Sequence, residues 1–194
     1  NSMFTKVLIA NRGEIAVRVI RACRELGIRS VVVYSKADAE SLAVRLADEA
    51  VCIGPASSAS SYLLIERILS VAAICDVDAI HPGYGFLSEN ADFARACEAA
   101  GITFIGPPSD VLAQMGDKLA AKATAIACNV PTIPGSTEPL KGADEAVEKA
   151  VSYGFPVILK AAAGGGGRGM RRCNNEEEVR LQFQLVKNEA KKAF

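Results

Sequence analysis

The sequence predicts an α/β protein in which a doubly wound parallel sheet is followed by a smaller α+β region. Throughout residues 3–107, short apolar segments rich in β-branched residues alternate with amphipathic helical segments. Alternation at this spacing is typical of βαβ units. Beyond a Pro-rich break, residues 131–194 contain only two strand-like and two helix-like segments. A region of that size buries little apolar area and would be marginal alone, which indicates the front part of a longer protein.

The first strand and helix form the first βα unit. Residues 6–10 are apolar and short, as expected for a strand. Residues 14–26 follow as a helix that ends at Gly27, and its apolar side chains recur at helical spacing, which puts them on the buried face. Those side chains are Ile15, Val19, Cys23 and Leu26. Arg21 and Glu25 lie four residues apart on the other side of the helix, where they can pair.

The remaining elements of the sheet region repeat this pattern. Residues 30–34 are almost continuously apolar, which is typical of a parallel strand covered on both faces. Shorter strands are expected at 49–53, 79–81 and 103–106, with helices at 62–75 and 91–100. Ser88 and Asn90 can cap the second of these helices, and Gly101 closes it.

Two breaker sequences divide the chain after the sheet region. Gly106-Pro107-Pro108-Ser109 ends the first domain, which we place at residues 3–108. A helical linker at 109–130 follows, and a second Pro- and Gly-containing breaker begins the last region, residues 131–194. The expected elements of the linker and the last region are helices over 109–115, 117–128, 144–153 and 176–192 and a hairpin over 157–173.

Composition excludes several function classes. Half of the 194 residues are hydrophobic, and 22 basic side chains balance 22 acidic ones, as in a packed globular protein. Zero net charge argues against nucleic acid or an anionic membrane as the main partner, because both attract basic surfaces. No apolar run approaches the roughly 18 residues that span a bilayer, and no signal peptide is visible. A cytoplasmic protein is therefore expected.

The six cysteines do not predict a metal site. No pair has Cys-x-x-Cys spacing, and His81 is the only histidine, so zinc is not expected. Most of the cysteines lie among apolar neighbours, where a reduced thiol acts as a small hydrophobic side chain. The sequence also shows no carboxylate cluster on short spacing for Mg²⁺ and no general-base dyad.

The most informative segment is the run of four glycines at 164–167. It follows an apolar strand that ends at Lys160, and it precedes Arg168 and a second strand beginning at Met170. Glycine lets a ligand approach the main chain, and successive N–H groups form a concavity that suits phosphate oxygens. A flexible linker is the alternative, but linkers are richer in Ser and lack the flanking strands and cations. The segment is no Walker loop, because the lysine precedes the glycines, and it predicts a mobile hairpin that closes over a nucleotide.

The segment 81–90 is a second candidate site. It lies at the carboxyl end of an expected strand, where open α/β sheets bind ligands. Gly83 and Gly85 flank Tyr84, which makes a loop suited to a small ligand. The alternative is a plain strand end followed by helix-capping residues.

Two further groups of polar residues give weaker signals. The turn after the first strand carries Gly13 without the other glycines of a dinucleotide-binding turn, so NAD binding is not supported. Asn11 and Glu14 are then ordinary loop and first-turn groups. Lys118 lies near the start of a helix, where an exposed lysine is usual. Taken with Lys160 and the glycine run, it is a candidate for a second phosphate contact.

Taken together, these segments resemble the biotin carboxylase family over nearly the whole chain and in the expected order. The matching motifs are Ile9-Ala10-Asn11-Arg12-Gly13-Glu14-Ile15-Ala16, Ala47-Asp48-Glu49-Ala50, Ile53-Gly54-Pro55, the segment 79–90, Phe104-Ile105-Gly106-Pro107, Met115-Gly116-Asp117-Lys118 and the segment 164–170. Members of that family join an N-terminal Rossmann-like domain to an ATP-grasp fold. They use MgATP and bicarbonate to carboxylate biotin on a carrier protein.

The resemblance implies a fold and a set of site residues. Residues 3–108 would be the Rossmann-like, pre-ATP-grasp domain, and residues 131–194 the lid subdomain of a truncated ATP-grasp core. ATP contacts are implied for Lys118, Lys160, Gly165, Gly166, Gly167 and Met170. The residues implied on the biotin side of the cleft are His81, Tyr84 and Gly85. The residues implied at a homodimer interface are Arg21 and Glu25.

The remaining functional groups of the family are expected outside the chain. The Mg²⁺-binding glutamates, the bicarbonate-binding arginine and the catalytic base would all lie beyond residue 194. No catalytic residue or metal ligand is therefore assigned here, and the chain is predicted to be inactive alone. Arg172-Cys173 is more polar than the usual apolar pair of the second hairpin strand, which predicts a solvent-facing edge.

The resemblance favours, as parent, the biotin carboxylase subunit of a bacterial-type acetyl-CoA carboxylase, which serves fatty acid synthesis. Its partners would be the biotin carboxyl carrier protein and the carboxyltransferase subunits. Pyruvate, propionyl-CoA and methylcrotonyl-CoA carboxylases share these motifs and stay open as alternatives, as does a non-catalytic module that self-associates through Arg21 and Glu25. A carbamoyl-phosphate synthetase fits less well, because the Asn-Arg-Gly-Glu and His-Pro-Gly-Tyr-Gly-Phe signatures weigh against it.

Overall fold

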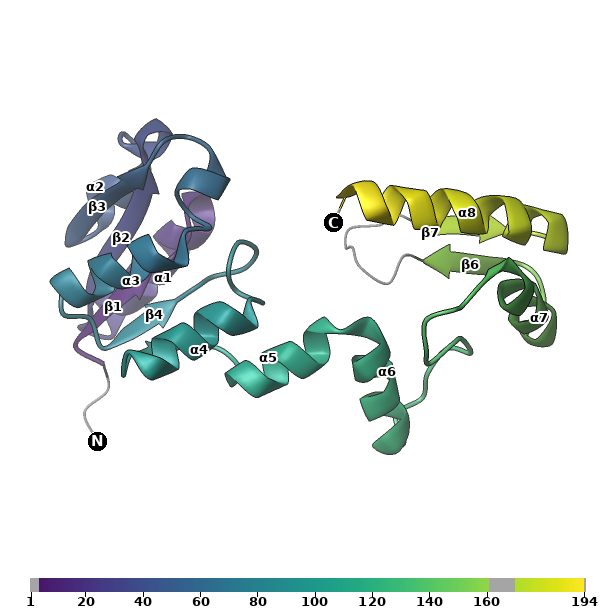
Figure 1. The fold of residues 1–194 in the computed structure, drawn as a ribbon. Coiled ribbons are helices and arrows are strands. Elements are labelled where there is room, and N and C mark those ends of the chain that lie inside the picture. The colour runs from purple at the N-terminus through teal and green to yellow at the C-terminus, as the bar shows by residue number, and fades with distance from the viewer. Residues whose placement is uncertain (1–3, 161–169, 194) are drawn as a thin grey trace. The chain divides into compact units, whose positions relative to one another are not determined.

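The structure, a computed structural model, describes residues 4–160 and 170–193 (Figure 1). The chain divides into two compact units, Asn1–Gln114 and Met115–Phe194, which are described separately. The first unit contains a five-stranded parallel sheet and the second a two-stranded antiparallel sheet. The predicted α/β fold class is confirmed.

The five strands of the first unit follow the order β3-β2-β1-β4-β5. Their bounds are β1 Lys6–Ile9, β2 Arg29–Ser35, β3 Glu49–Gly54, β4 Ala79–His81 and β5 Thr103–Phe104. Its helices are α1 Gly13–Glu25, α2 Leu42–Leu46, α3 Ile65–Ile74, α4 Ala91–Ala99 and α5 Ser109–Gly116, the last of which runs across the division between the units, and 3₁₀ turns span Lys36–Asp38 and Ser58–Ser60. The chain builds β2 and β3 on one side of β1, then returns to build β4 and β5 on the other. Strands β1 and β4 therefore flank the topological switch point, where sheets of this kind open a ligand crevice at the carboxyl ends.

Helices cover both faces of this sheet. Alternate residues of β1 point to opposite faces, so Val7 and Ile9 pack in a buried cluster with α1, whereas Leu8 packs in a second cluster with α3 and α4. The central strands are apolar on both faces for this reason, as the run at 30–34 predicted. Among the described residues, no helix is long and apolar enough to span a membrane.

The first unit differs from the sequence prediction at the start of α3 and at Leu26. Helix α3 begins at Ile65 rather than at residue 62, because Tyr62 is buried at 2% exposure and its ring belongs to the core. Leu26 was expected on the buried face of α1 but is 60% exposed, and the buried face instead includes the expected Val19 and Cys23 with Ala16, Val17 and Ile20. Asn90 caps α4 by accepting a hydrogen bond from the Phe93 N–H, as predicted.

The second unit is built around a hairpin. Its elements are α6 Lys118–Ala127, α7 Ala143–Tyr153, β6 Val157–Lys160, β7 Met170–Cys173 and α8 Glu176–Ala193. The strands are antiparallel, with Lys160 opposite Met170 and Val157 opposite Cys173. Helices α7 and α8 pack on one face of the hairpin through Val147, Cys173 and Val179. Helix α6 contributes no buried side chain to the described part of this unit.

Candidate functional site

The loop that follows β4 lies at the switch point of the five-stranded sheet. The Ala10 N–H donates to the His81 carbonyl at 2.9 Å, which joins the ends of β1 and β4. The Gly83 N–H donates to Nδ1 of His81 at 3.0 Å, so the proton of the neutral imidazole lies on Nε2. Burial lowers the pKa of His81, which keeps the ring neutral at physiological pH. The imidazole therefore serves as an acceptor that shapes the loop.

Asn11 fixes this loop from the turn after β1. Asn11 is only 4% exposed, and its side-chain Nδ2 donates to the carbonyl oxygens of Pro82 and Tyr84, both at 2.8 Å. Gly83 lies between those carbonyls with φ +65°, and a Cβ there would approach Asn11 Nδ2 to 2.6 Å. Glycine is therefore required at 83 by close approach as well as by its backbone angle. Sequence reasoning treated Asn11 as an ordinary loop group and missed this contact; the amide directly after a buried strand was the available signal.

The exposed side of the same loop contacts the start of α1. Gly13 opens this helix with φ +64°, in agreement with its prediction as a turn residue. The Tyr84 hydroxyl donates to Oε1 of Glu14 at 2.8 Å, and this hydrogen bond raises the pKa of Tyr84. Tyr84 is 63% exposed and Gly85 is exposed with φ +68°. The structure thus brings the predicted loop residues to the carboxyl-end edge of the sheet, the edge at which open α/β sheets bind ligands.

A second polar group supports the far end of the loop. Arg12 donates through Nε and Nη2 to the two carboxylate oxygens of Asp38, at 2.7 and 2.6 Å. The Tyr62 hydroxyl donates to Oδ2 of Asp38 at 2.5 Å and accepts a hydrogen bond from the Ser35 N–H at 3.0 Å. The Tyr62 ring stacks on Phe86 with a centroid distance of 5.0 Å. Segments that follow four strands, β1 to β4, are therefore tied together, and a binding role was predicted only for the segment after β4.

The charges of this group are mutually stabilised. The hydrogen bonds from Arg12, with smaller contributions from Tyr62 and Ser35, lower the pKa of Asp38 to about 2 against the opposing effect of burial. The same pair raises the pKa of the Arg12 guanidinium. Burial raises the pKa of Tyr62, and its hydrogen bond to Asp38 acts in the same direction. Asp38 therefore stays ionised and Tyr62 stays protonated across the physiological range.

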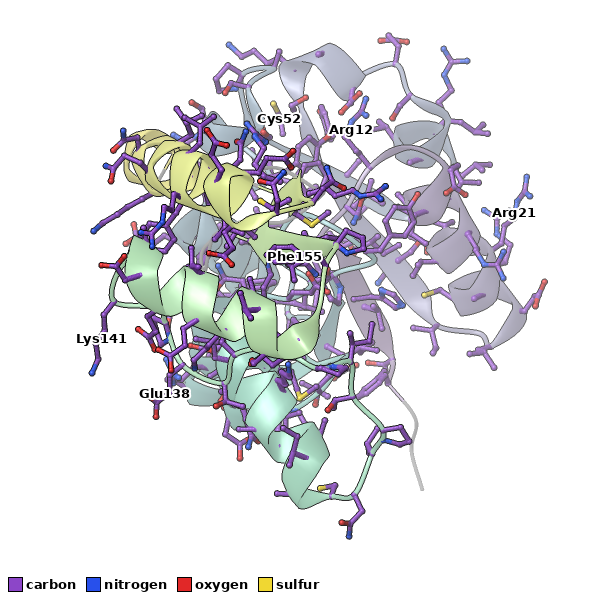
Figure 2. The ribbon with its side chains drawn as sticks, turned by 90° about the vertical axis from the view of Figure 1, so that its right-hand side faces the viewer. Arg12, Arg21, Cys52, Glu138, Lys141 and Phe155 are labelled. Carbon is purple, nitrogen blue, oxygen red and sulfur yellow. The ribbon has the colours of Figure 1, made fainter. Side chains whose placement is uncertain are left out.

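The two residues predicted at a dimer interface lie in a surface groove between α1 and α2. The groove has a volume of about 740 Å³, and its lining includes Arg18, Arg21, Glu25 and Leu42. Figure 2 shows Arg21 on the outer side of α1, with its side chain pointing away from the sheet. Both Arg21 and Glu25 are exposed. The ion pairs of the described residues do not include the expected Arg21–Glu25 pair, so in this structure both charges face solvent.

In the second unit, the hairpin presents a distinct face. Alternate residues of a strand point to opposite sides, so the side that α7 and α8 leave uncovered carries every second residue of β6 and β7. These residues are Ile158, Lys160, Met170 and Arg172, and all four are exposed. Cys173 is fully buried on the other side, so the predicted solvent-facing edge holds for Arg172 and is wrong for Cys173. The predicted Gly165, Gly166 and Gly167 lie outside the described residues.

Lys118 is the first residue of α6 and is exposed. Asp117 caps this helix, with Oδ1 accepting from the N–H groups of Leu119 and Ala120 at 2.8 and 2.9 Å. The motif around Lys118 thus has a clear role in starting a helix. Among the described residues, α6 contributes none to the buried cluster that packs on β6 and β7. The packing of this cluster therefore does not connect Lys118 with Lys160.

The described residues do not form a metal site. Within residues 4–160 and 170–193, no three His, Cys, Asp or Glu side chains gather where they could hold a metal ion. Four of the cysteines, Cys23, Cys75, Cys97 and Cys173, are buried as free thiols, as expected, whereas Cys52 and Cys128 are exposed. Burial raises the pKa of Cys97 to about 11, which keeps that thiol protonated and unreactive.

Comparisons with known proteins cover both units. Residues 3–112 match the family model described as biotin carboxylase, N-terminal domain, and residues 117–194 match carbamoyl-phosphate synthase L chain, ATP binding domain. Biotin carboxylase 1 of Bacillus subtilis is 54% identical over 192 residues, which are 99% of this chain and 43% of the relative. Propionyl-CoA carboxylase alpha chain of Ruegeria pomeroyi is 50% identical over 99% of this chain and 28% of the relative. The chain therefore spans less than half the length of these curated relatives.

A solved structure shows the same architecture. The biotin carboxylase domain dimer of Hydrogenobacter thermophilus 2-oxoglutarate carboxylase, in complex with MgADP, ADP and bicarbonate, is 52% identical. It superposes with a TM-score of 0.94 over 100% of this chain and 43% of that chain. The Campylobacter jejuni biotin carboxylase in complex with β,γ-ATP also gives a TM-score of 0.94, at 47% identity over 99% of this chain and 43% of that chain.

Proposed function

This chain belongs to the biotin carboxylase family, and from that premise we propose that it is the N-terminal part of an enzyme that uses MgATP and bicarbonate to carboxylate biotin on a carrier protein. The observation that carries the proposal is the match over both units, at 54% identity to a curated biotin carboxylase. The structural neighbour bound to MgADP and bicarbonate supports an adenine nucleotide and bicarbonate as ligands of this fold.

We assign nucleotide binding to the uncovered face of the hairpin. Lys160 and Met170 are directly opposite in the antiparallel pair, next to Ile158 and Arg172. Two cations beside two exposed apolar side chains suit a ligand that combines a flat apolar base with a charged phosphate chain. The full set proposed to contact ATP is Lys118, Lys160, Gly165, Gly166, Gly167 and Met170. Bound ATP would supply the phosphoryl group that activates bicarbonate.

Mg²⁺ does not fit the described residues, because they hold no suitable group of ligands. We therefore derive no step through the metal ion within this chain. The metal ligands, the bicarbonate-binding arginine and the catalytic base are proposed to lie in the rest of the parent enzyme. The expected consequence is that these residues bind and orient substrates but do not turn them over alone.

The loop after β4 is proposed to form the biotin side of the cleft through His81, Tyr84 and Gly85. Its place at the switch point and the exposure of Tyr84 and Gly85 support this role. The groove with Arg21 and Glu25 is proposed to contribute to a homodimer, since the related domain of 2-oxoglutarate carboxylase is a dimer. The further proposed partners are the biotin carboxyl carrier protein and carboxyltransferase subunits, in the cytoplasm.

The acyl-CoA pathway is the least constrained part of the proposal. We favour acetyl-CoA carboxylase and fatty acid synthesis, because curated biotin carboxylases reach 54 and 58% identity. Propionyl-CoA carboxylase at 50% and mitochondrial pyruvate carboxylase of Rattus norvegicus at 53% are close enough that these pathways, and that of methylcrotonyl-CoA carboxylase, stay as alternatives. A non-catalytic module that self-associates would instead show a stable dimer without affinity for ATP.

The deciding experiment measures ADP release from MgATP in the presence of bicarbonate and free biotin. We expect no biotin-dependent release from this chain alone, and release once the downstream half of the parent is added. Lys160→Gln should reduce the restored activity, whereas Lys141→Gln, an exposed lysine of the same unit, should not. Figure 2 labels Lys141. Biotin-dependent turnover by the chain alone, or none after complementation, would contradict the proposal.

A further inference from the structure

We propose that Asn11 is a positioning residue for the biotin substrate, because it sets the backbone of the loop 81–86 that carries Tyr84 and Gly85. This inference rests on the proposed function, since it takes that loop as the biotin side of the cleft. It goes further by assigning a specific role to a residue that makes no expected contact with any substrate.

The geometry around Asn11 leaves the loop little freedom. Both hydrogens of its amide are used, one on the carbonyl of Pro82 and one on that of Tyr84, each at 2.8 Å. Its Oδ1 accepts from the Arg12 N–H at 2.8 Å, which fixes the orientation of the amide. A flipped amide would place an oxygen against two carbonyl oxygens and would lose all three hydrogen bonds. The backbone is therefore clamped on both sides of Gly83.

The neighbouring residues of the same turn hold the loop at two more points. Arg12 binds Asp38, Asp38 accepts from Tyr62, and the Tyr62 ring stacks on Phe86 at the end of the loop. On the exposed side, the Tyr84 hydroxyl donates to Glu14. The three polar residues of the Asn-Arg-Gly-Glu segment thus reach the start, the middle and the end of one loop.

The exposed fractions of these residues distinguish those that hold the loop from the core side from the one that can contact a ligand. Asn11 and Tyr62 are 4% and 2% exposed and lie on the core side of the loop. Tyr84 is 63% exposed on its outer side. A buried and fully satisfied polar network is rigid, and a shift of about 1 Å in a substrate-positioning group can cost roughly 100-fold in rate. Substitutions that loosen the network should therefore raise KM for biotin, which the loop is proposed to contact, more than KM for ATP.

The test uses the full-length enzyme that contains this chain, with steady-state ADP release as the readout. We expect Asn11→Ala to raise KM for free biotin about tenfold, from the loss of one buried and one partly buried hydrogen bond. KM for ATP should stay within about twofold, because the proposed ATP residues belong to the second unit. The matched control is Ser30→Ala. Ser30 is 1% exposed and its hydroxyl bonds Asp48 at 2.9 Å, but it lies near the amino end of β2, away from the loop.

The outcomes are distinguishable. An unchanged KM for biotin in Asn11→Ala, or an equal rise in Ser30→Ala, would overturn the positioning role. Should Asn11→Ala fail to fold, Tyr62→Phe is the deciding variant, because it keeps the ring that stacks on Phe86 and removes only the hydroxyl that bonds Asp38. We expect Tyr62→Phe to raise KM for biotin about threefold. An unchanged KM for biotin in this variant would overturn the inference. Wild-type enzyme without biotin-dependent ADP release would instead refute the proposed function, and this inference with it.

Discussion

In the first unit both faces of the five-stranded sheet are covered by helices, whereas in the second unit the described hairpin is covered on one face only. The candidate loop of the first unit is held by two hydrogen bonds from the buried Asn11 and by the Arg12–Asp38–Tyr62 group. The candidate residues Lys160 and Met170 of the second unit stand on an exposed face.

The difference shows two ways in which the proposed binding groups are held in the structure. A loop that is clamped from the core side has its conformation set before a ligand arrives, which lowers the entropy lost on binding. An uncovered strand face with Ile158 and Met170 instead leaves apolar area that a ligand can cover, so the ligand itself contributes burial. We therefore expect substitutions in the first unit to act through stability and geometry, and those on the hairpin face to act through affinity.

The largest expected effect is that of removing a central aromatic ring from the first unit. Phe93 is fully buried and contacts Phe104 edge to face at 5.8 Å, so Phe93→Ala should reduce the free energy of unfolding of this unit by about 3–5 kcal/mol. Val179→Ala, at a fully buried position of the second unit, should cost about 1–2 kcal/mol there. Urea unfolding, monitored by amide hydrogen exchange in each unit separately, measures both losses of stability. Equal loss of protection in both units with either variant would show that they unfold together and would break the comparison.

The next effect tests the close approach beneath the loop. Gly83→Ala places a Cβ 2.6 Å from Asn11 Nδ2 at φ +65°, and we expect a loss of about 2–4 kcal/mol from crowding and backbone strain. Gly116→Ala is the matched variant at the start of the second unit, because a Cβ there meets nothing within 4 Å and the residue ends helix α5. It should be neutral or stabilise by up to about 1 kcal/mol. Thermal unfolding of the two variants provides the measurement. Similar losses of stability in Gly83→Ala and Gly116→Ala would mean that the close contact between Gly83 and Asn11 does not restrict residue 83.

The third prediction concerns acid. Asp38 has a pKa of about 2 in the folded protein against an ordinary value of 3.8, so folding favours its charged form. The ionised group therefore adds about 2 kcal/mol of stability above pH 5, and this contribution is lost as the pH falls toward 2, with about half gone by pH 3. Asp38→Asn should lower the free energy of unfolding at pH 7 by a similar amount. The difference in the free energy of unfolding between Asp38→Asn and wild type should become smaller at pH 3. A difference that does not change with pH would argue against the ion pair as its source.

The smallest expected effect is at an exposed ion pair of the second unit. Asp144 and Arg180 form a salt bridge with side chains that are 91% and 53% exposed. Solvent screens such a pair, so Asp144→Asn should change the free energy of unfolding by no more than about 0.5 kcal/mol. Urea unfolding beside Asp38→Asn provides the measurement. A loss as large as that of Asp38→Asn would remove the contrast between Asp38, whose side chain is 12% exposed, and the exposed pair of the second unit.

Local patterns explain why much of the fold could be predicted. Strand and helix periods, with breakers such as Gly106-Pro107-Pro108, depend on a few neighbouring residues, so the order of the strands and longer helices and the antiparallel pairing of β6 with β7 agree with the prediction, whereas the short helix α2 was not predicted. The boundaries of α3 and the exposure of Leu26 were not, because each depends on which distant elements pack there. The proposed assignments of ATP and biotin residues stay predictions for the experiments above.

The sequence alone determined the fold class and the family, since these follow from local periodicity and from motifs read in order. Only the tertiary structure revealed what Asn11, Arg12 and Glu14 do, because their partners lie on the loop after β4 and near the end of β2. It also decided which side of the hairpin carries Lys160 and Met170, through the strand register and the two helices packed on the opposite face. Long-range hydrogen bonds and burial cannot be inferred from a local pattern, since each depends on residues that are distant in sequence.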